Sequence, residues 1–154
     1  MTIEVGDPAP SFTLLDHTGA AVSLEDFSGS HLLAYFYPKA FTPGCTTQAC
    51  DLRDRQDAFT DVGWAIVGIS PDPVEKLRKF HSEHRLTFSL LSDEDHAVAT
   101  AYGAWGIKKN YGREYEGLIR STFVIGPNGT IELARRNTKA AGHGDRMLKE
   151  LLKT

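Results

Sequence analysis

The two cysteines of this 154-residue chain, Cys45 and Cys50, both lie in one stretch, FYPKAFTPGCTTQAC. A cysteine can act as a nucleophile, a redox centre or a metal ligand, and in each case the reactive form is the thiolate. A separation of five positions is too wide for a C-x-x-C redox pair. In a reducing cytosol, two neighbouring cysteines are expected to serve transient redox chemistry or metal binding rather than a permanent disulfide.

The residues before Cys45 predict that it lies in the first turn of a helix. A continuous apolar run, HLLAYFYP, stops at Pro38, which is typical of a strand buried on both faces. Thr42 and Pro43 then have the residue types favoured at a helix N-cap and at the first helical position. Unpaired N–H groups and the helix dipole favour a thiolate there. Gly44 lets the backbone approach whatever the sulfur attacks.

Packing offers an alternative explanation for both cysteines. A free cysteine is most often a small buried hydrophobe, and Cys45 shares a helical stripe with Ala49, Leu52 and Phe59. The position of Cys45 at a helix start favours a nucleophile. For Cys50 taken alone, the packing interpretation is the better one.

The elements that must position these residues form an alternating pattern. We expect strands over 11–16 and 21–26, a strand over 31–38, a helix from 43 to before Gly63, a strand over 64–70, a helix over 72–84, a strand over 88–93, a helix over 96–103, a hairpin over 118–126 and 131–137, and a helix over 143–154. This order predicts parallel crossovers in a central mixed sheet with helices on both faces, and antiparallel edge strands from the late hairpin. The sequence thus predicts an α/β, thioredoxin-like fold with an N-terminal β-hairpin, as a single domain over 1–154.

Composition and charge exclude several classes of function. The net charge is −3, so no basic surface for nucleic acid or anionic lipid is expected. The opening MTIEVGDPAP lacks signal-peptide features, and the longest apolar run, LLAYFY, is far shorter than the roughly 20 residues of a membrane span. We therefore expect a cytoplasmic protein with neither a membrane nor a nucleic-acid partner. The six histidines are scattered, and His81 and His84 are better explained by a solvated helix face than by a metal site.

The stretch PKAFTPGC fits the P-x-x-x-T-x-x-C signature of peroxiredoxins. The chain resembles their bacterioferritin comigratory protein (peroxiredoxin Q) branch through TPGCTTQACDLRD, IVGISPDPVEKL, FSLLSDEDHAVATAYGAWG and GLIRSTFVIGPNGTI. The similarity covers nearly the whole chain, in order. It implies a cysteine-dependent peroxidase that acts on hydrogen peroxide and organic hydroperoxides without haem, flavin, metal or any other cofactor.

The resemblance also implies a role for each matching residue. Cys45 would be the peroxidatic nucleophile, Thr42 would hydrogen-bond its thiolate and the incoming peroxide, and Pro38 would shield the pocket from water. Gly44 would line the substrate site. Arg120, in LIRSTF, would lie beside the sulfur, where a guanidinium stabilises a thiolate and donates to a peroxide oxygen. A surface charge is the alternative for Arg120.

The second half of the implied reaction involves Cys50 as the resolving thiol. It would form a disulfide with Cys45, re-reduced by thioredoxin or a glutaredoxin-like donor. Because both thiols are in one chain, we expect a monomer. Many peroxiredoxins have glutamate three residues after the catalytic cysteine, where this chain has Gln48; we expect this change to tune the reactivity rather than abolish it.

The spacing of the two cysteines constrains that disulfide. On an ideal helix, residues five apart have Cα atoms about 9 Å apart. A disulfide tolerates at most about 7 Å. We therefore expect the first turns of the helix to unwind on oxidation.

Two other functions are possible from the sequence. A thiol–disulfide carrier would be expected to have C-x-x-C at the helix start, where this chain has C-x-x-x-x-C. A non-catalytic holdase or binding module could retain the fold, but Thr42, Cys45 and Arg120 together argue against it. The aromatic residues within 102–117 are interpreted either as a rim of the site or as loop packing.

Overall fold

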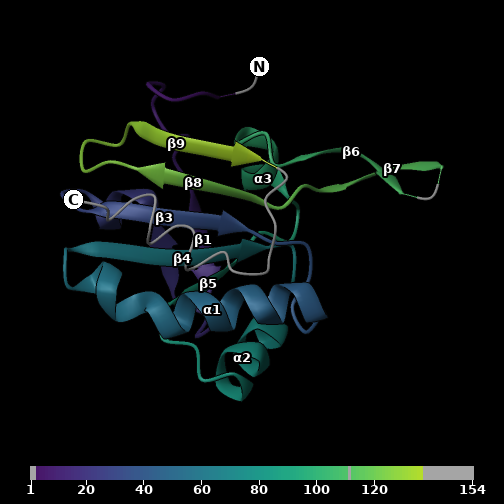
Figure 1. Cartoon of the computed structure of the whole chain (residues 1–154), viewed down its shortest axis with the longest axis horizontal. Helices are drawn as coiled ribbons and strands as arrows, with labels where there is room; N and C mark the ends of the chain where they lie inside the picture. The colour runs from purple at the N-terminus through teal and green to yellow at the C-terminus, as the bar shows by residue number, and fades with distance from the viewer. Residues whose placement is uncertain (1–2, 111, 137–154) are drawn as a thin grey trace.

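The computed structural model describes residues 3–110 and 112–136 of the chain. A short hairpin comes first, and strands then alternate with helices (Figure 1). The elements are β1 (Thr13–Asp16), β2 (Ala21–Ser23), the 3₁₀ helix η1 (Leu24–Phe27), β3 (His31–Phe36), α1 (Pro43–Thr60), β4 (Trp64–Ser70), α2 (Val74–Glu83), β5 (Ser89–Ser92), α3 (Ala97–Ala101), β6 (Trp105–Asn110), β7 (Arg113–Leu118), β8 (Ser121–Ile125) and β9 (Ile131–Arg136). The helix expected over 143–154 lies outside the described residues.

Seven of the strands form one mixed sheet in the order β2-β1-β5-β4-β3-β8-β9. The pairs β3–β4 and β4–β5 are parallel, and the two helical crossovers α1 and α2 connect them. The hairpins β1–β2 and β8–β9 add antiparallel strands at the two edges. The predicted α/β class, mixed sheet and N-terminal hairpin are therefore confirmed.

Strand β3 is buried on both faces, as its continuous apolar sequence predicts. Leu33 and Tyr35 point into the core beneath α1 and α2, whereas Leu32, Ala34 and Phe36 pack in the core on the opposite face. Figure 1 shows α1 and α2 together on one side of the sheet. The core on the other face includes Ala99 of α3, so helices cover both faces.

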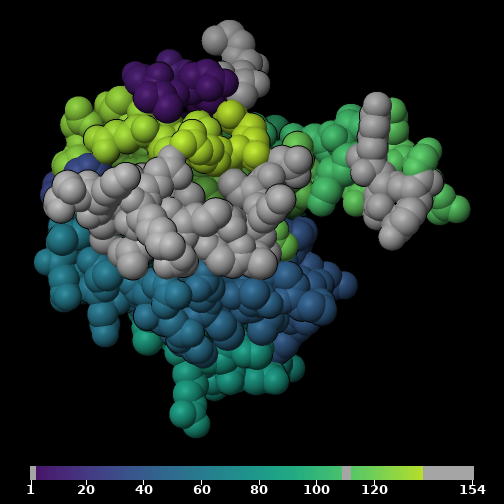
Figure 2. Space-filling model, in the orientation of Figure 1, coloured from purple at the N-terminus to yellow at the C-terminus, as the bar shows by residue number. Residues whose placement is uncertain are grey.

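The segment that follows α3 forms a second, separate sheet, which the sequence pattern does not predict. Strands β6 and β7 pair antiparallel from Trp105 opposite Leu118 to Asn110 opposite Arg113. The turn between them contains Gly112 at φ 76°, a left-handed conformation that glycine adopts without strain. Figure 2 shows this ribbon extending from the body of the molecule, and Ile107 and Tyr115 are exposed on it.

Among the described residues, no helix combines the length and apolar character needed to span a membrane.

Candidate functional site

Cys45 lies in the first turn of α1, as the sequence predicts. Thr42 is the N-cap residue in extended conformation, Pro43 opens the helix, and the amide of Thr46 donates to the carbonyl of Thr42 at 2.9 Å. The Cys45 side chain is 1% exposed and belongs to the core beneath α1. The packing interpretation is thus correct for its burial, but this burial occurs at the helix terminus that stabilises a thiolate.

The loop that connects β3 to α1 is fixed by a buried carboxylate, Asp72, at the end of β4. Its Oδ2 accepts hydrogen bonds from the Ala40 amide at 2.7 Å and from the Ser70 hydroxyl at 2.9 Å. Lys76 Nζ lies 3.2 Å from Oδ1. From the sequence, Asp72 is expected only as the start of a helix. The available signal is an acidic residue two positions after a buried strand.

Arg120 brings its guanidinium to Cys45 from a distant part of the chain. Its Nη2 lies 3.1 Å from Cys45 Sγ, and its Nη1 donates to Oε1 of Gln48. Arg120 directly precedes β8, and Ser121 pairs with Phe36 at the end of β3, which brings the arginine to the start of α1. We call these two contacts the Arg120 bridge; they place a positive charge where a thiolate would form.

Gln48 takes part in the bridge because it lies one helical turn after Cys45 and is completely buried. A neutral amide at this position accepts a hydrogen bond from Arg120 without adding a negative charge beside the sulfur.

The Thr42 hydroxyl makes a different contact from the one expected. Its Oγ1 donates to the carbonyl of Lys39 at 2.7 Å. A hydroxyl has one proton to donate, so donation to the sulfur or to a peroxide requires rotation of this side chain. Pro38 and Gly44 are both half-buried. Pro38 lies two residues after β3, and Gly44 is the second residue of α1. The substrate roles of these three residues stay predictions.

Two buried tyrosines on the face of the sheet beneath α1, Tyr35 and Tyr37, share the core of Cys45. A Cβ atom on Gly68 would lie 2.8 Å from the Tyr35 ring, so glycine at this point of β4 makes room for it. Burial raises the pKa of both tyrosines far above the physiological range, and nearby ionisable groups, including Cys45, raise it further. Both phenols therefore stay neutral and place no competing negative charge below the thiol.

Cys50 lies further along α1 and faces α2 instead of Arg120. It is half-buried, and its Sγ is 4.0 Å from Nδ1 of His84, the residue that caps the C-terminus of α2. Both cysteines are free thiols on one continuous helix. Their Cα atoms are therefore about 9 Å apart by helix geometry, and no disulfide can form while the helix is intact.

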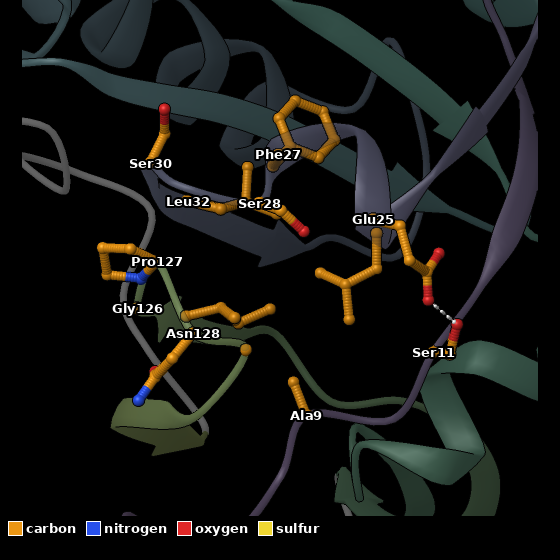
Figure 3. A pocket seen from close by; sticks show the side chains of 13 residues that line it. Ala9, Ser11, Glu25, Phe27, Ser28, Ser30, Leu32, Gly126, Pro127 and Asn128 are labelled. Atoms are coloured by element: carbon orange, nitrogen blue, oxygen red, sulfur yellow. Dashed lines mark hydrogen bonds between the residues drawn. The ribbon is translucent and has the colours of Figure 1, made fainter.

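A pocket of about 350 Å³ lies at the opposite end of β3 from this site. Figure 3 shows it between the segment after η1 and the turn before β9, with Ala9 and Ser11 from the N-terminal segment completing its wall. Ser11 hydrogen-bonds to Glu25 at its edge. Ser30 precedes β3 whereas Cys45 follows it, so this pocket is not part of the thiol site.

Comparison with known proteins agrees with this geometry. Residues 5–134 match the AhpC/TSA family. A putative peroxiredoxin of Mycobacterium tuberculosis is 52% identical over 146 residues, covering 95% of this chain and 93% of the relative. Peroxiredoxin Bcp of Bacillus subtilis is 44% identical over 151 residues, covering 98% and 96%.

A solved structure gives the same result for the fold. A mutant of peroxiredoxin Q from Xanthomonas campestris superposes with a TM-score of 0.87 at 36% identity, covering 92% of this chain and 90% of that one. The predicted thioredoxin-like fold is therefore confirmed. Cys45 at the helix start and Arg120 at its sulfur agree with these matches. The chain belongs to the AhpC/TSA family and, within it, to the peroxiredoxins of the Bcp or peroxiredoxin Q type, which are thiol peroxidases.

Proposed function

We propose that Cys45 is the peroxidatic nucleophile of this thiol peroxidase and that Cys50 is its resolving thiol. The observation that supports this most strongly is the 3.1 Å contact between Arg120 Nη2 and Cys45 Sγ in the first turn of α1. The N-terminus of α1 and the Arg120 guanidinium both stabilise a negative charge on the sulfur.

The first step oxidises Cys45. Its thiolate attacks the terminal oxygen of hydrogen peroxide or an organic hydroperoxide, the O–O bond breaks, and the leaving oxygen takes a proton to become water or an alcohol. The sulfur gains one oxygen as sulfenic acid. As the O–O bond lengthens, negative charge moves onto the leaving oxygen, and Arg120 can donate to it while still close to the sulfur. Thr42, once its hydroxyl rotates from Lys39, adds a second donor.

The second step joins the two cysteines. The Cys50 thiolate attacks the Cys45 sulfur, the S–S bond forms, the S–O bond breaks, and hydroxide leaves as water after taking a proton. This requires the first turns of α1 to unwind, because the helix holds the Cα atoms too far apart. The Arg120 bridge and the helical hydrogen bonds after Thr42 must break at that stage.

The cycle closes with an external dithiol. Attack on one sulfur of the disulfide and exchange within the mixed disulfide restore both thiols and oxidise the donor. We propose thioredoxin or a glutaredoxin-like protein as this donor and the cytoplasm as the compartment, because a dithiol pool must keep Cys45 and Cys50 reduced. A monomer suffices, since both thiols come from one α1.

Rapid mixing with peroxide tests the two roles separately. Wild type, Cys45→Ser and Cys50→Ser are mixed with peroxide, and consumption and thiol oxidation are followed. We expect Cys45→Ser to lose peroxide reduction. Cys50→Ser should keep one fast turnover and then stop as sulfenic acid. Wild-type rates in Cys45→Ser would exclude the proposal, and full recycling in Cys50→Ser would exclude its resolving role.

A further inference from the structure

His84 is the polar side chain that meets Cys50 on the side away from Cys45. Its Nδ1 lies 4.0 Å from Cys50 Sγ, at the outer limit of a sulfur hydrogen bond. Catalytic hydrogen bonds are often long before the reacting state and shorten within it. A small rotation of the Cys50 side chain would therefore bring its thiol proton within range of the imidazole.

The imidazole is held in place by its surroundings. Phe80, one turn earlier in α2, meets the ring edge-to-face with centroids 5.1 Å apart, and Phe41 lies on another side at 6.2 Å. The His84 carbonyl accepts a hydrogen bond of 2.6 Å from Nη1 of Arg53 on α1. Position and orientation of the ring are thus fixed by both helices and by the loop before α1.

We propose that His84 is the general base that prepares Cys50 for the resolution step. Nδ1 takes the Cys50 thiol proton while α1 is still folded, and Nε2 carries the other ring proton. Cys50 then leaves the helix as a thiolate and attacks the Cys45 sulfenic sulfur. The S–S bond forms, the S–O bond breaks, and the departing hydroxide becomes water with a proton from the imidazolium or from solvent. Atoms, charge and electrons balance without a further reactant.

The charged side chains beside the pair are Arg53 and Asp54, which form an ion pair with each other. The hydrogen bond to Asp54 raises the pKa of Arg53, and Cys50 adds a smaller contribution, so this guanidinium stays positive. The same guanidinium would oppose a cation on His84, but Asp54 Oδ1 accepts from its Nε at 3.0 Å and its Nη2 at 2.8 Å. Tyr35, which also interacts with Cys50, stays neutral because burial raises its pKa. Because the charges of Arg53 and Asp54 largely offset each other, the proposed transfer rests on the contact between Cys50 and His84.

The expected size of the effect follows from the ionisation of thiols. An ordinary thiol with a pKa near 8.5 is only about 3% ionised at about pH 7. A base that ionised it fully would raise the reactive fraction by about 30-fold, which sets the upper limit, and the gain is smaller because a more acidic thiol is less nucleophilic. Loss of His84 should therefore slow resolution near neutral pH by at most about 30-fold. The difference should vanish by about pH 9.5, where thiols ionise unaided.

The test is a single peroxide pulse followed by acid quench, alkylation and mass spectrometry. This separates sulfenic acid formation on Cys45 from disulfide formation with Cys50. His84→Phe keeps a ring for Phe41 and Phe80 to contact but cannot take a proton, and His84→Gln keeps polarity. His81→Gln on the same helix is the matched control. We expect both His84 variants to form sulfenic acid at the wild-type rate and to resolve it slowly, with convergence at high pH.

The inference rests on the proposed function, and the two can fail separately. If wild type forms no sulfenic acid on Cys45, the proposed function is wrong. If sulfenic acid forms but His84→Phe resolves it at the wild-type rate near neutral pH, the role of His84 is wrong. A pH-independent slowing would show that His84 only packs. Partial rescue of disulfide formation in His84→Ala by added imidazole would support the proton transfer. An equal loss of sulfenic acid formation and of disulfide formation would indicate misfolding, which a thermal melt checks.

Discussion

Changing the helix propensity of Thr47 should change how fast the disulfide forms. Thr47 is exposed in the segment of α1 between the two cysteines, so its substitution changes the helix propensity of this segment without removing a core contact. If unwinding of this segment precedes attack by Cys50, the observed resolution rate is the opening constant multiplied by the rate of attack. Stiffening the segment must then slow resolution, and loosening it must accelerate resolution.

The magnitude follows from measured helix propensities. Threonine costs about 0.5 to 0.7 kcal/mol relative to alanine in a helix interior, and glycine costs about 1 kcal/mol. Thr47→Ala should therefore slow resolution about two- to threefold, and Thr47→Gly should accelerate it up to about twofold. The two variants should differ about fivefold, since about 1.4 kcal/mol corresponds to a factor of ten.

The assay is the same quenched peroxide pulse, read as the rate at which sulfenic acid on Cys45 becomes a disulfide. The oxidation of Cys45 by peroxide serves as the internal control. Hydrogen-exchange mass spectrometry of the oxidised protein should also show lost amide protection over the start of α1. Equal resolution rates in Thr47→Ala and Thr47→Gly, or the opposite order, would refute the idea that this segment of α1 must open before Cys50 attacks.

Two further predictions concern the charges of the molecule. Replacing Arg120 by methionine removes the charge-assisted contact with Cys45, which is worth about 1.5–3 kcal/mol. The rates of reaction with peroxide and of alkylation by iodoacetamide should therefore fall about 10- to 150-fold. Arg120→Lys keeps the charge but loses the two-pronged geometry, so its rates should lie between those of wild type and Arg120→Met. Burial lowers the pKa of both His17 and His81, which stack 3.6 Å apart, and the Leu90 amide donates to Nδ1 of His17. The unfolded chain therefore binds more protons than the folded one as pH falls through about 6.5, so urea denaturation should show stability decreasing from about pH 7.5 to about pH 5, with a smaller decrease in His81→Gln.

Most of the fold could be predicted because its signals are local. Strand β3 is recognisable from six consecutive residues that are all apolar or aromatic apart from His31, and α1 from Thr42 and Pro43 at its start.

The β6–β7 ribbon is not predictable from the sequence, for a physical reason. It packs little against the core, so its residues follow no burial pattern, and the clearest local signal is Gly112 in the turn.

The site itself was only partly predictable. Cys45 at the helix start follows from neighbouring residues, but its contact with Arg120 joins positions 75 residues apart and was reached through resemblance to a family. Asp72 bonds to Ala40 across 32 residues, and His84 meets Cys50 across 34. Such contacts depend on which strand ends and helix ends meet in the folded sheet, and no spacing along the chain encodes them.

The Arg120 bridge helps to explain how one helix can serve two opposed steps. In the proposed cycle it would stabilise the start of α1 while Cys45 is a thiolate, which would favour attack on peroxide but oppose the opening that Cys50 needs. Oxidation replaces the negative sulfur by a neutral sulfenic acid, and a hydrogen bond to a neutral acceptor is about half as strong as one to an ion. The chemical step therefore weakens the contact that keeps the helix closed. We therefore expect opening to become easier once peroxide has oxidised Cys45, which would order the two proposed steps without a separate trigger.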